Sequence, residues 1–250
     1  MSVRLCDIQA GYGGLHKGER QVLPAESLLE AMRRLTIDAA LVRLEPDASD
    51  VDFQLSNELL FKACDQHPEL VPCPVAVPAT AYDLPPEPEQ TDAVIRRGAC
   101  AAMVRPSHDD WEPLPCVYER LLAAMADRQL PLYCALHYVP FAKVAEFAEY
   151  QPNLPIIITQ AGYRSQRTIV PLLETYPNVH LAIGANWTIH RGIEQMVERV
   201  GAEKLLFGTG YPAAEPMMAV TQLMYAQISD EQKTLIGAGN FERLAAGVKS

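Results

Sequence analysis

One stretch of the chain decides its fold: Lys204-Leu205-Leu206-Phe207-Gly208-Thr209-Gly210-Tyr211-Pro212. A short apolar run that is closed by glycines, a tyrosine and a proline is typical of a buried strand that ends in a sharp loop. The residues that follow, 216–226, have the pattern of a helix. We therefore interpret this stretch as a strand–loop–helix unit, and it is the last unit of a series.

Seven similar units precede it. The strands that we expect are residues 3–8, 37–44, 71–78, 100–105, 132–138, 154–159, 179–185 and, as the eighth, 204–208. The helices that we expect between and after them are residues 24–36, 52–69, 92–97, 117–128, 141–150, 168–175, 189–200, 216–226 and 229–246, the last of which begins with a Ser-Asp-Glu-Gln capping box. Residues 82–90 are rich in proline and acidic side chains, so we expect a loop there.

Near-continuous apolar strands that alternate with helices indicate a parallel sheet covered on its faces. Eight such repeats favour a closed (β/α)8 TIM barrel over an open doubly wound sheet, because the glycines after the first strand lack the G-x-G-x-x-G spacing. A barrel of this kind commonly takes about 250 residues. We therefore expect a single domain over residues 1–250.

The composition excludes several classes of protein. The formal net charge is −10 and the chain has no basic block, so nucleic acid is not an expected partner. No apolar run is long enough to span a membrane, and no signal peptide is visible at the N-terminus. The six scattered cysteines fit a reducing compartment better than a disulfide framework, so we expect a cytoplasmic protein.

In a parallel barrel, side chains at the carboxyl ends of the strands surround the mouth of the active site. Those ends are polar and aromatic in this chain, unlike the strand bodies, and so predict a ligand pocket. The candidates for binding a substrate are Gln9, Arg43, Arg105, Gln160, Tyr163, Asn186 and Tyr211. We expect a small anionic ligand, because guanidinium groups bind carboxylates or phosphates; the alternative is that the arginines pair with the nearby acids Glu45, Asp47 and Asp109.

Two further residues are candidates for catalysis. His137 ends the fifth strand and has a pKa suited to acid–base chemistry; the alternative is a hydrogen bond to Gln9 or Gln160. Asp7 is either a proton shuttle or a buried carboxylate that accepts hydrogen bonds from loop amides. Trp187 either contributes to a ligand wall or packs in the core. His108 is a weaker candidate at the end of the fourth strand and is otherwise a loop residue. Four other histidines are expected to be solvated away from the mouth: His16, His67, His180 and His190.

The closing segment resembles that of the amidohydrolase-related TIM-barrel hydrolases, and so does the run Asn240-Phe241-Glu242-Arg243-Leu244. In that family, Asp-x-His-x-His on strand one, histidines on strands five and six and an aspartate on strand eight serve a divalent metal. Here, of those metal positions, only His137 keeps its residue. The other four are changed to Gln9, Gly11, Gln160 and Gly210.

The resemblance therefore implies a divergent barrel with a degenerate metal site. One histidine and two neutral glutamines do not supply the roughly three charged or imidazole ligands that a catalytic metal needs, so we expect neither a metal nor another cofactor. One hypothesis is a metal-independent hydrolase, lactonase or decarboxylase that acts on a small carboxylated compound. The other is a catalytically inactive barrel that serves as a binding or assembly protein. An apolar stretch at residues 216–218 is either an interface between copies of the chain or ordinary packing.

Overall fold

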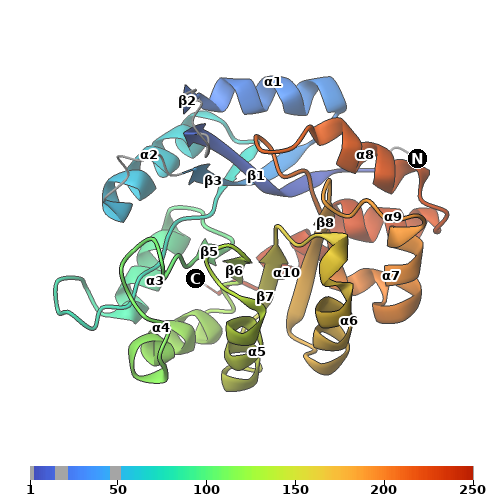
Figure 1. The fold of residues 1–250 in the computed structure, drawn as a ribbon. Helices are drawn as coiled ribbons and strands as arrows, with labels where there is room; N and C mark the ends of the chain where they lie inside the picture. Colours follow the sequence, from blue (N-terminus) through green and yellow to red (C-terminus); the bar gives the residue numbers. More distant parts are fainter. Residues whose placement is uncertain (1–2, 15–21, 46–51, 250) are drawn as a thin grey trace.

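The computed structural model describes residues 3–14, 22–45 and 52–249, and parallel strands form its inner layer (Figure 1). The strands pair in two sheets of order β2-β1-β3-β4 and β5-β6-β7-β8-β9. A parallel bridge between Val75 and Met103 joins the segment after β4 to β5, and the amide of Gly11 donates a 2.9 Å hydrogen bond to the carbonyl of Tyr211 after β9. These contacts close the (β/α)8 TIM barrel that the sequence predicts.

The bounds of the strands are β1 (Cys6–Gly14), β2 (Val22–Leu23), β3 (Ala39–Glu45), β4 (Leu70–Pro72), β5 (Ala102–Met103), β6 (Leu132–Ala135), β7 (Ile156–Thr159), β8 (Val179–Gly184) and β9 (Leu205–Gly208). All neighbouring pairs are parallel except β1 and β2, which form a short antiparallel pair. The strand β2 is therefore an addition to the eight strands of the barrel.

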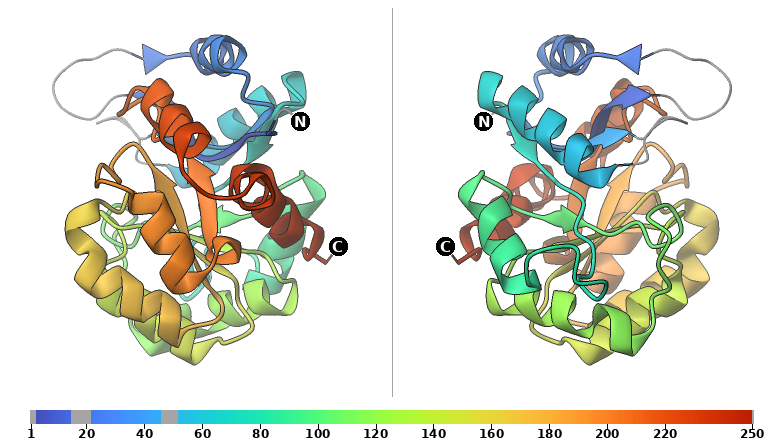
Figure 2. Two further views of the ribbon diagram at one scale, coloured as in Figure 1. Left: turned by 90° about the vertical axis from the view of Figure 1, so that its right-hand side faces the viewer. Right: turned by 90° about the vertical axis from the view of Figure 1, so that its left-hand side faces the viewer.

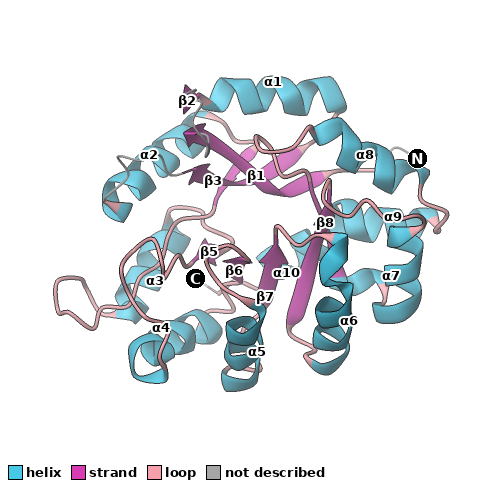
Figure 3. Ribbon diagram, in the orientation of Figure 1, coloured by secondary structure: helices cyan, strands magenta, loops and turns pink. Residues whose placement is uncertain are grey.

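Helices surround the strands as an outer ring, which Figure 3 separates by colour and Figure 2 shows from two sides. Their bounds are α1 (Ala25–Leu35), α2 (Phe53–Gln66), α3 (Glu87–Arg96), α4 (Pro115–Asp127), α5 (Phe141–Tyr150), α6 (Gln166–Thr175), α7 (Gly192–Val200), α8 (Pro216–Tyr225), α9 (Asp230–Thr234) and α10 (Asn240–Ala246), with single turns η1 (Tyr163–Ser165), η2 (Ala202–Lys204) and η3 (Leu235–Gly239). The predicted capping box is confirmed: the Ser229 hydroxyl accepts from the Gln232 amide, and the Gln232 side chain accepts from the Ser229 amide.

The core has two layers because successive side chains of a strand point to opposite faces. In β6, Tyr133 and Ala135 belong to the cluster inside the barrel, whereas Leu132 and Cys134 belong to the cluster between strands and helices. Both clusters are buried, which explains why the strands read as continuous apolar runs.

Several predicted boundaries are wrong, including the end of the third strand, which was expected at residue 78 and lies at Pro72. Two others have a clear physical reason. The first strand continues beyond residue 8 to Gly14, because its glycine-rich end pairs with β3 and with β2. The helix α3 begins at Glu87, inside the predicted loop 82–90, because Pro86 and Pro88 fall at the start of the helix, where a missing N–H costs no hydrogen bond.

The prediction for His180 is also wrong. Its side chain is buried, not solvated, and burial together with the nearby Lys204 and Arg243 lowers its pKa to about 4. It lies on β8, whereas the exposed His190 fits the expectation. His16 lies outside the described residues.

The six cysteines are free thiols. In residues 3–14, 22–45 and 52–249, no helix is both long and apolar enough to cross a membrane. Met217 and Met218, at the start of α8, are exposed.

Candidate active site

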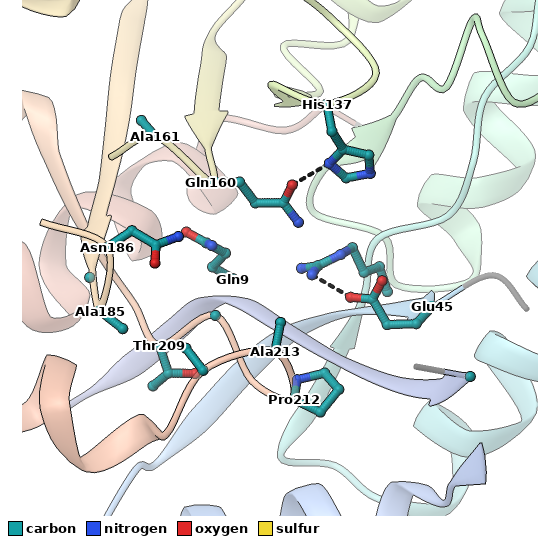
Figure 4. Close-up of a pocket in the computed structure, with 15 residues that line it drawn as sticks. Gln9, Glu45, His137, Gln160, Ala161, Ala185, Asn186, Thr209, Pro212 and Ala213 are labelled. Atoms are coloured by element: carbon teal, nitrogen blue, oxygen red, sulfur yellow. Dashed lines mark hydrogen bonds and ion pairs between the residues drawn. The ribbon is translucent and has the colours of Figure 1, made fainter. Parts of the chain in front are cut away.

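A cavity of about 840 Å³ opens at the carboxyl ends of the barrel strands (Figure 4). It lies at the end of the barrel where the polar strand ends were predicted to converge. The described residues that line it are Gln9, Gly14, Arg43, Glu45, His137, Gln160, Ala161, Gly184, Ala185, Asn186, Thr209, Gly210, Pro212, Ala213 and Ala214.

His137 and Gln160 form one wall of the cavity. The Nδ1 atom of His137, in the turn after β6, hydrogen-bonds to Oε1 of Gln160, in the turn after β7. A carbonyl oxygen only accepts, so Nδ1 is the donor in this contact. It is the hydrogen bond that the sequence offered as the alternative to a catalytic role of His137. Gln160 adopts a left-handed backbone with φ of 61°, an uncommon conformation for a residue other than glycine, which tends to occur at functional sites.

Asp7 lies beneath the cavity and is not among its described lining residues. Its side chain is 1% exposed and accepts hydrogen bonds from the amides of Gln9 (2.9 Å) and Thr209 (2.8 Å) and from the Thr209 hydroxyl. Burial raises the pKa of Asp7, and the hydrogen bonds from Thr209 and Gln9, with the charge of Arg43, oppose that increase. The carboxylate thus ties β1 to the loop after β9, as the second interpretation of the sequence anticipated.

Arg43 and Glu45 also line the cavity, and Figure 4 shows the carboxylate of Glu45 in an ion pair there. The Nη1 group of Arg43 donates to the Ala10 carbonyl (3.2 Å) and to the Tyr133 hydroxyl (2.9 Å), and Nη2 pairs with the Glu45 carboxylate. Burial alone would lower the pKa of Arg43, but Tyr133 and Glu45 outweigh it and raise that pKa. The guanidinium is therefore charged, and three groups hold it in place.

Arg105 is placed differently. It is 1% exposed and is absent from the described lining of the cavity. It forms a forked ion pair with Asp109, with Nη2–Oδ1 at 2.8 Å and Nε–Oδ2 at 3.2 Å. For both arginines, the structure contains the local acidic partner that was the alternative to an anionic ligand.

The remaining predicted residues divide into two groups. Asn186 lines the cavity with Gln9 and Gln160. Tyr163 and Tyr211 are not in the described lining: Tyr163 is 37% exposed beside Arg164, and Tyr211 is half-buried. Trp187 packs in the core, with its indole nitrogen 3.4 Å from the Gly192 carbonyl.

Sequence reasoning gave Thr209 no role and treated Glu45 only as a local acid. Both had a signal. Glu45 lies two residues after Arg43, so the two side chains share one face of β3. Thr209 is the polar residue that directly follows the apolar run of β9, at the end of the barrel that carries the cavity.

The residues at the implied metal positions do not fit a catalytic metal. They offer the His137 imidazole and the neutral amides of Gln9 and Gln160, while positions 11 and 210 have no side chain. Within the described residues, no group of three or more histidine, cysteine, aspartate or glutamate side chains is arranged to hold an ion. Metal ligands in catalytic sites are imidazoles, thiolates or carboxylates, so this donor set lacks the required charge.

Comparison with known proteins gives a family and a fold. The family model described as amidohydrolase matches residues 16–244. A 2,6-dihydroxybenzoate decarboxylase from Rhizobium superposes with a TM-score of 0.73 at 15% identity, covering 98% of this chain and 99% of that one. A 5-carboxyvanillate decarboxylase from Sphingomonas paucimobilis gives 0.71 at 13% identity (98% and 99%), and a candidate 2-pyrone-4,6-dicarboxylic acid hydrolase from Pseudomonas putida gives 0.69 at 14% identity (99% and 99%). No curated protein sequence matches the chain.

Proposed function

The chain belongs to the amidohydrolase family, and from that premise we propose that it is a metal-independent hydrolase that opens an ester, such as a lactone, in a small carboxylated compound. Decarboxylation of such a compound is the other reaction that the site can accommodate. Solved relatives of the same fold support this range, since their names specify carboxylated ring compounds as the molecules that they cleave or decarboxylate.

The observation that carries the proposal is the hydrogen bond between His137 Nδ1 and Gln160 Oε1 at the cavity wall. With Nδ1 as the donor to Gln160, we assign Nε2 as the nitrogen that acts as the base. In the proposed reaction, Nε2 takes a proton from water while the water oxygen bonds to the ester carbonyl carbon. The carbonyl electrons move to its oxygen, then return as the bond to the leaving oxygen breaks, and that oxygen receives the proton from His137.

The other lining groups would stabilise this sequence electrostatically. Arg43 is a fixed cation, and the amide groups of Gln9 and Asn186 are hydrogen-bond donors in the same cavity. Preorganised donors of this kind stabilise the negative charge that develops on the carbonyl oxygen. Asp7 does not contact the cavity, so we assign it a positioning role, in which it fixes Gln9 and Thr209 through their backbone amides.

No step of this reaction passes through a metal ion, because the donor set does not fit one. The base is the imidazole itself, whose ordinary pKa lies close to neutral pH. Activity should therefore persist after dialysis against a chelator. Loss of activity that returns on adding a stoichiometric divalent metal would refute the metal-independent mechanism.

The test is a screen of carboxylated lactones and carboxylated aromatic compounds, followed by His137→Ala. Ester hydrolysis is read as acid release and decarboxylation as release of carbon dioxide. A general base typically contributes 10²–10⁴-fold to the rate, so His137→Ala should lower kcat by about that factor. The matched control is His190→Ala, at an exposed position outside the described lining of the cavity, which should keep full activity.

One outcome would reject the enzyme hypothesis, and another would reject the role of His137. If no compound is turned over while a carboxylate raises the melting temperature, the chain acts as a binding protein. If turnover is found but His137→Ala and His190→Ala are equally active, the imidazole is not the base.

A further inference from the structure

We propose that Glu45 is a specificity-determining residue: its carboxylate, held on Arg43, restricts the cavity to ligands that carry no more than one carboxylate group. The inference rests on the proposed function, because it concerns the substrate class of the same cavity. It differs from the simple view that Arg43 is available to any anion.

The first step is steric. Strands β1 and β3 are parallel neighbours in which Gly11 pairs with Arg43 and Gly13 with Glu45. A Cβ atom built on Gly11 would lie 2.6 Å from Oε1, 3.0 Å from Cγ and 3.2 Å from Cδ of Glu45. Real Cβ atoms do not approach oxygen so closely, so the Glu45 carboxylate occupies the space that a side chain at position 11 would take.

The second step concerns mobility. Arg43 is fixed by the Ala10 carbonyl and the Tyr133 hydroxyl, so its guanidinium cannot turn away from Glu45 without breaking buried hydrogen bonds. The side chain of Glu45 is 13% exposed and that of Arg43 is 5% exposed. Water therefore screens this pair weakly, and the negative charge of Glu45 acts on anything that enters the cavity.

The third step is the charge of the cavity. Of the described residues that line it, Arg43 and Glu45 are the charged ones, and their charges cancel. A ligand with one carboxylate is attracted by the charge of Arg43, which lines the cavity. A second carboxylate meets no further described cation in the lining and is repelled by Glu45.

This arrangement also suits turnover. Hydrolysis of a lactone releases one additional carboxylate and, at neutral pH, one proton. A substrate with one carboxylate therefore becomes a product with two, which the internal anion disfavours. Glu45 would thus accept the substrate and weaken the binding of the product.

The test compares benzoate and isophthalate, which have the same ring and differ by one carboxylate, by titration calorimetry with the full chain. The wild type should bind benzoate about tenfold more tightly than isophthalate, since one like charge at short range is worth on the order of a factor of ten. Glu45→Gln keeps the shape of the side chain and removes its charge, so it should tighten isophthalate binding by about tenfold and erase the preference. Glu242→Gln, which removes a remote exposed carboxylate, should leave the preference unchanged.

A second variant guards against misfolding of Glu45→Gln. Gly11→Ala keeps both charges but pushes the carboxylate off its position, so it should also reduce the preference for benzoate. The proposal is overturned if the wild type binds isophthalate as tightly as benzoate, if neither variant changes the ratio, or if neither probe binds to Glu45→Gln. These readouts need no turnover, so they succeed or fail separately from the test of His137.

Discussion

Two arginines near the ends of barrel strands, Arg43 and Arg105, differ in what their charges can reach. Both are almost fully buried and both pair with an acid close in sequence, Glu45 and Asp109. The Arg43 pair lines the cavity, whereas the Arg105 pair is absent from its described lining. The same residue type at equivalent places thus belongs to a ligand site in one case and to the scaffold in the other.

This contrast shows that the role of a buried arginine, structural or ligand-binding, can be inferred only together with the acid that it pairs with. The forked pair of Arg105 and Asp109 satisfies two guanidinium donors with two carboxylate oxygens. Among the described residues, the Glu45 carboxylate pairs with Nη2 of Arg43, and the other hydrogen bonds of that guanidinium are to uncharged oxygens. A structural role follows for the first pair and a role in ligand selection for the second.

The largest expected effect concerns the scaffold pair. Asp109→Ala leaves Arg105 buried without its carboxylate, which typically costs about 3–5 kcal/mol of unfolding free energy. Urea unfolding measures this loss. Asp92→Ala is the matched control, since it breaks the more exposed pair with Arg128 and should cost far less. Equal losses in the two variants would remove the distinction between scaffold and surface pairs.

The second effect concerns His180, a buried titratable group that, unlike the two arginines, has no carboxylate partner among the described residues. The folded chain keeps His180 neutral down to a pKa of about 4, whereas an unfolded histidine takes up a proton near pH 6.5. The unfolded state therefore binds more protons between these values, and stability falls as the pH falls from 6.5 to 4, by roughly 3 kcal/mol. His180→Gln should lose this dependence and His190→Gln should keep it. Urea unfolding at a series of pH values decides the matter.

A smaller loss of unfolding free energy is expected at Asp7, a buried acid whose hydrogen-bond donors are neutral groups of Gln9 and Thr209 and not a guanidinium. Valine has nearly the same shape as threonine, so Thr209→Val removes the hydroxyl that donates to Asp7 and changes little else in the side chain. A hydrogen bond contributes about 0.5–1.5 kcal/mol to stability, and more where the acceptor is charged, so the unfolding free energy should drop by about 1.5 kcal/mol. Because burial raises the pKa of Asp7, any additional loss from a charged acceptor should appear as the pH rises. No loss at any pH would show that this hydroxyl does not stabilise the buried carboxyl group.

The smallest effect separates the two arginines directly. Arg43→Lys keeps a charge but loses the planar fork, so benzoate affinity should fall by about tenfold, equal to roughly 1.4 kcal/mol. Arg105→Lys should leave benzoate affinity within about twofold, because Arg105 is not in the described lining. Titration calorimetry of both variants provides the measurement. Equal weakening by both would restore the prediction that both arginines bind the ligand.

The barrel was predictable because its strands are buried on both faces, which leaves uninterrupted apolar runs such as Ile156–Thr159 in β7. The convergence of Gln9, His137 and Gln160 was predictable for a related reason, since the carboxyl ends of parallel strands meet at one end of a barrel. The resemblance to amidohydrolases is confirmed by the family match over residues 16–244.

What could not be predicted depends on contacts distant in sequence. The glycines at residues 11–14 indicate a loop in isolation, and only pairing with β3 makes them strand. His180 looks like any histidine near the start of a strand until Lys204 and Arg243 are placed beside it. The hydrogen-bond donor that Thr209 supplies to the buried Asp7 carboxylate lies 202 residues later in the chain.

The glycine at position 11 has a consequence for how this chain could change over time. A histidine introduced there would collide with Glu45, so it can be tolerated only after the residue at 45 has been shortened. At position 210, the backbone φ of 78° disfavours most replacements, and a new side chain would begin 3.4 Å from the Gln9 amide. The metal-ligand set that the resemblance implies is therefore not one substitution away from this chain, because positions 11 and 210 both resist a new side chain.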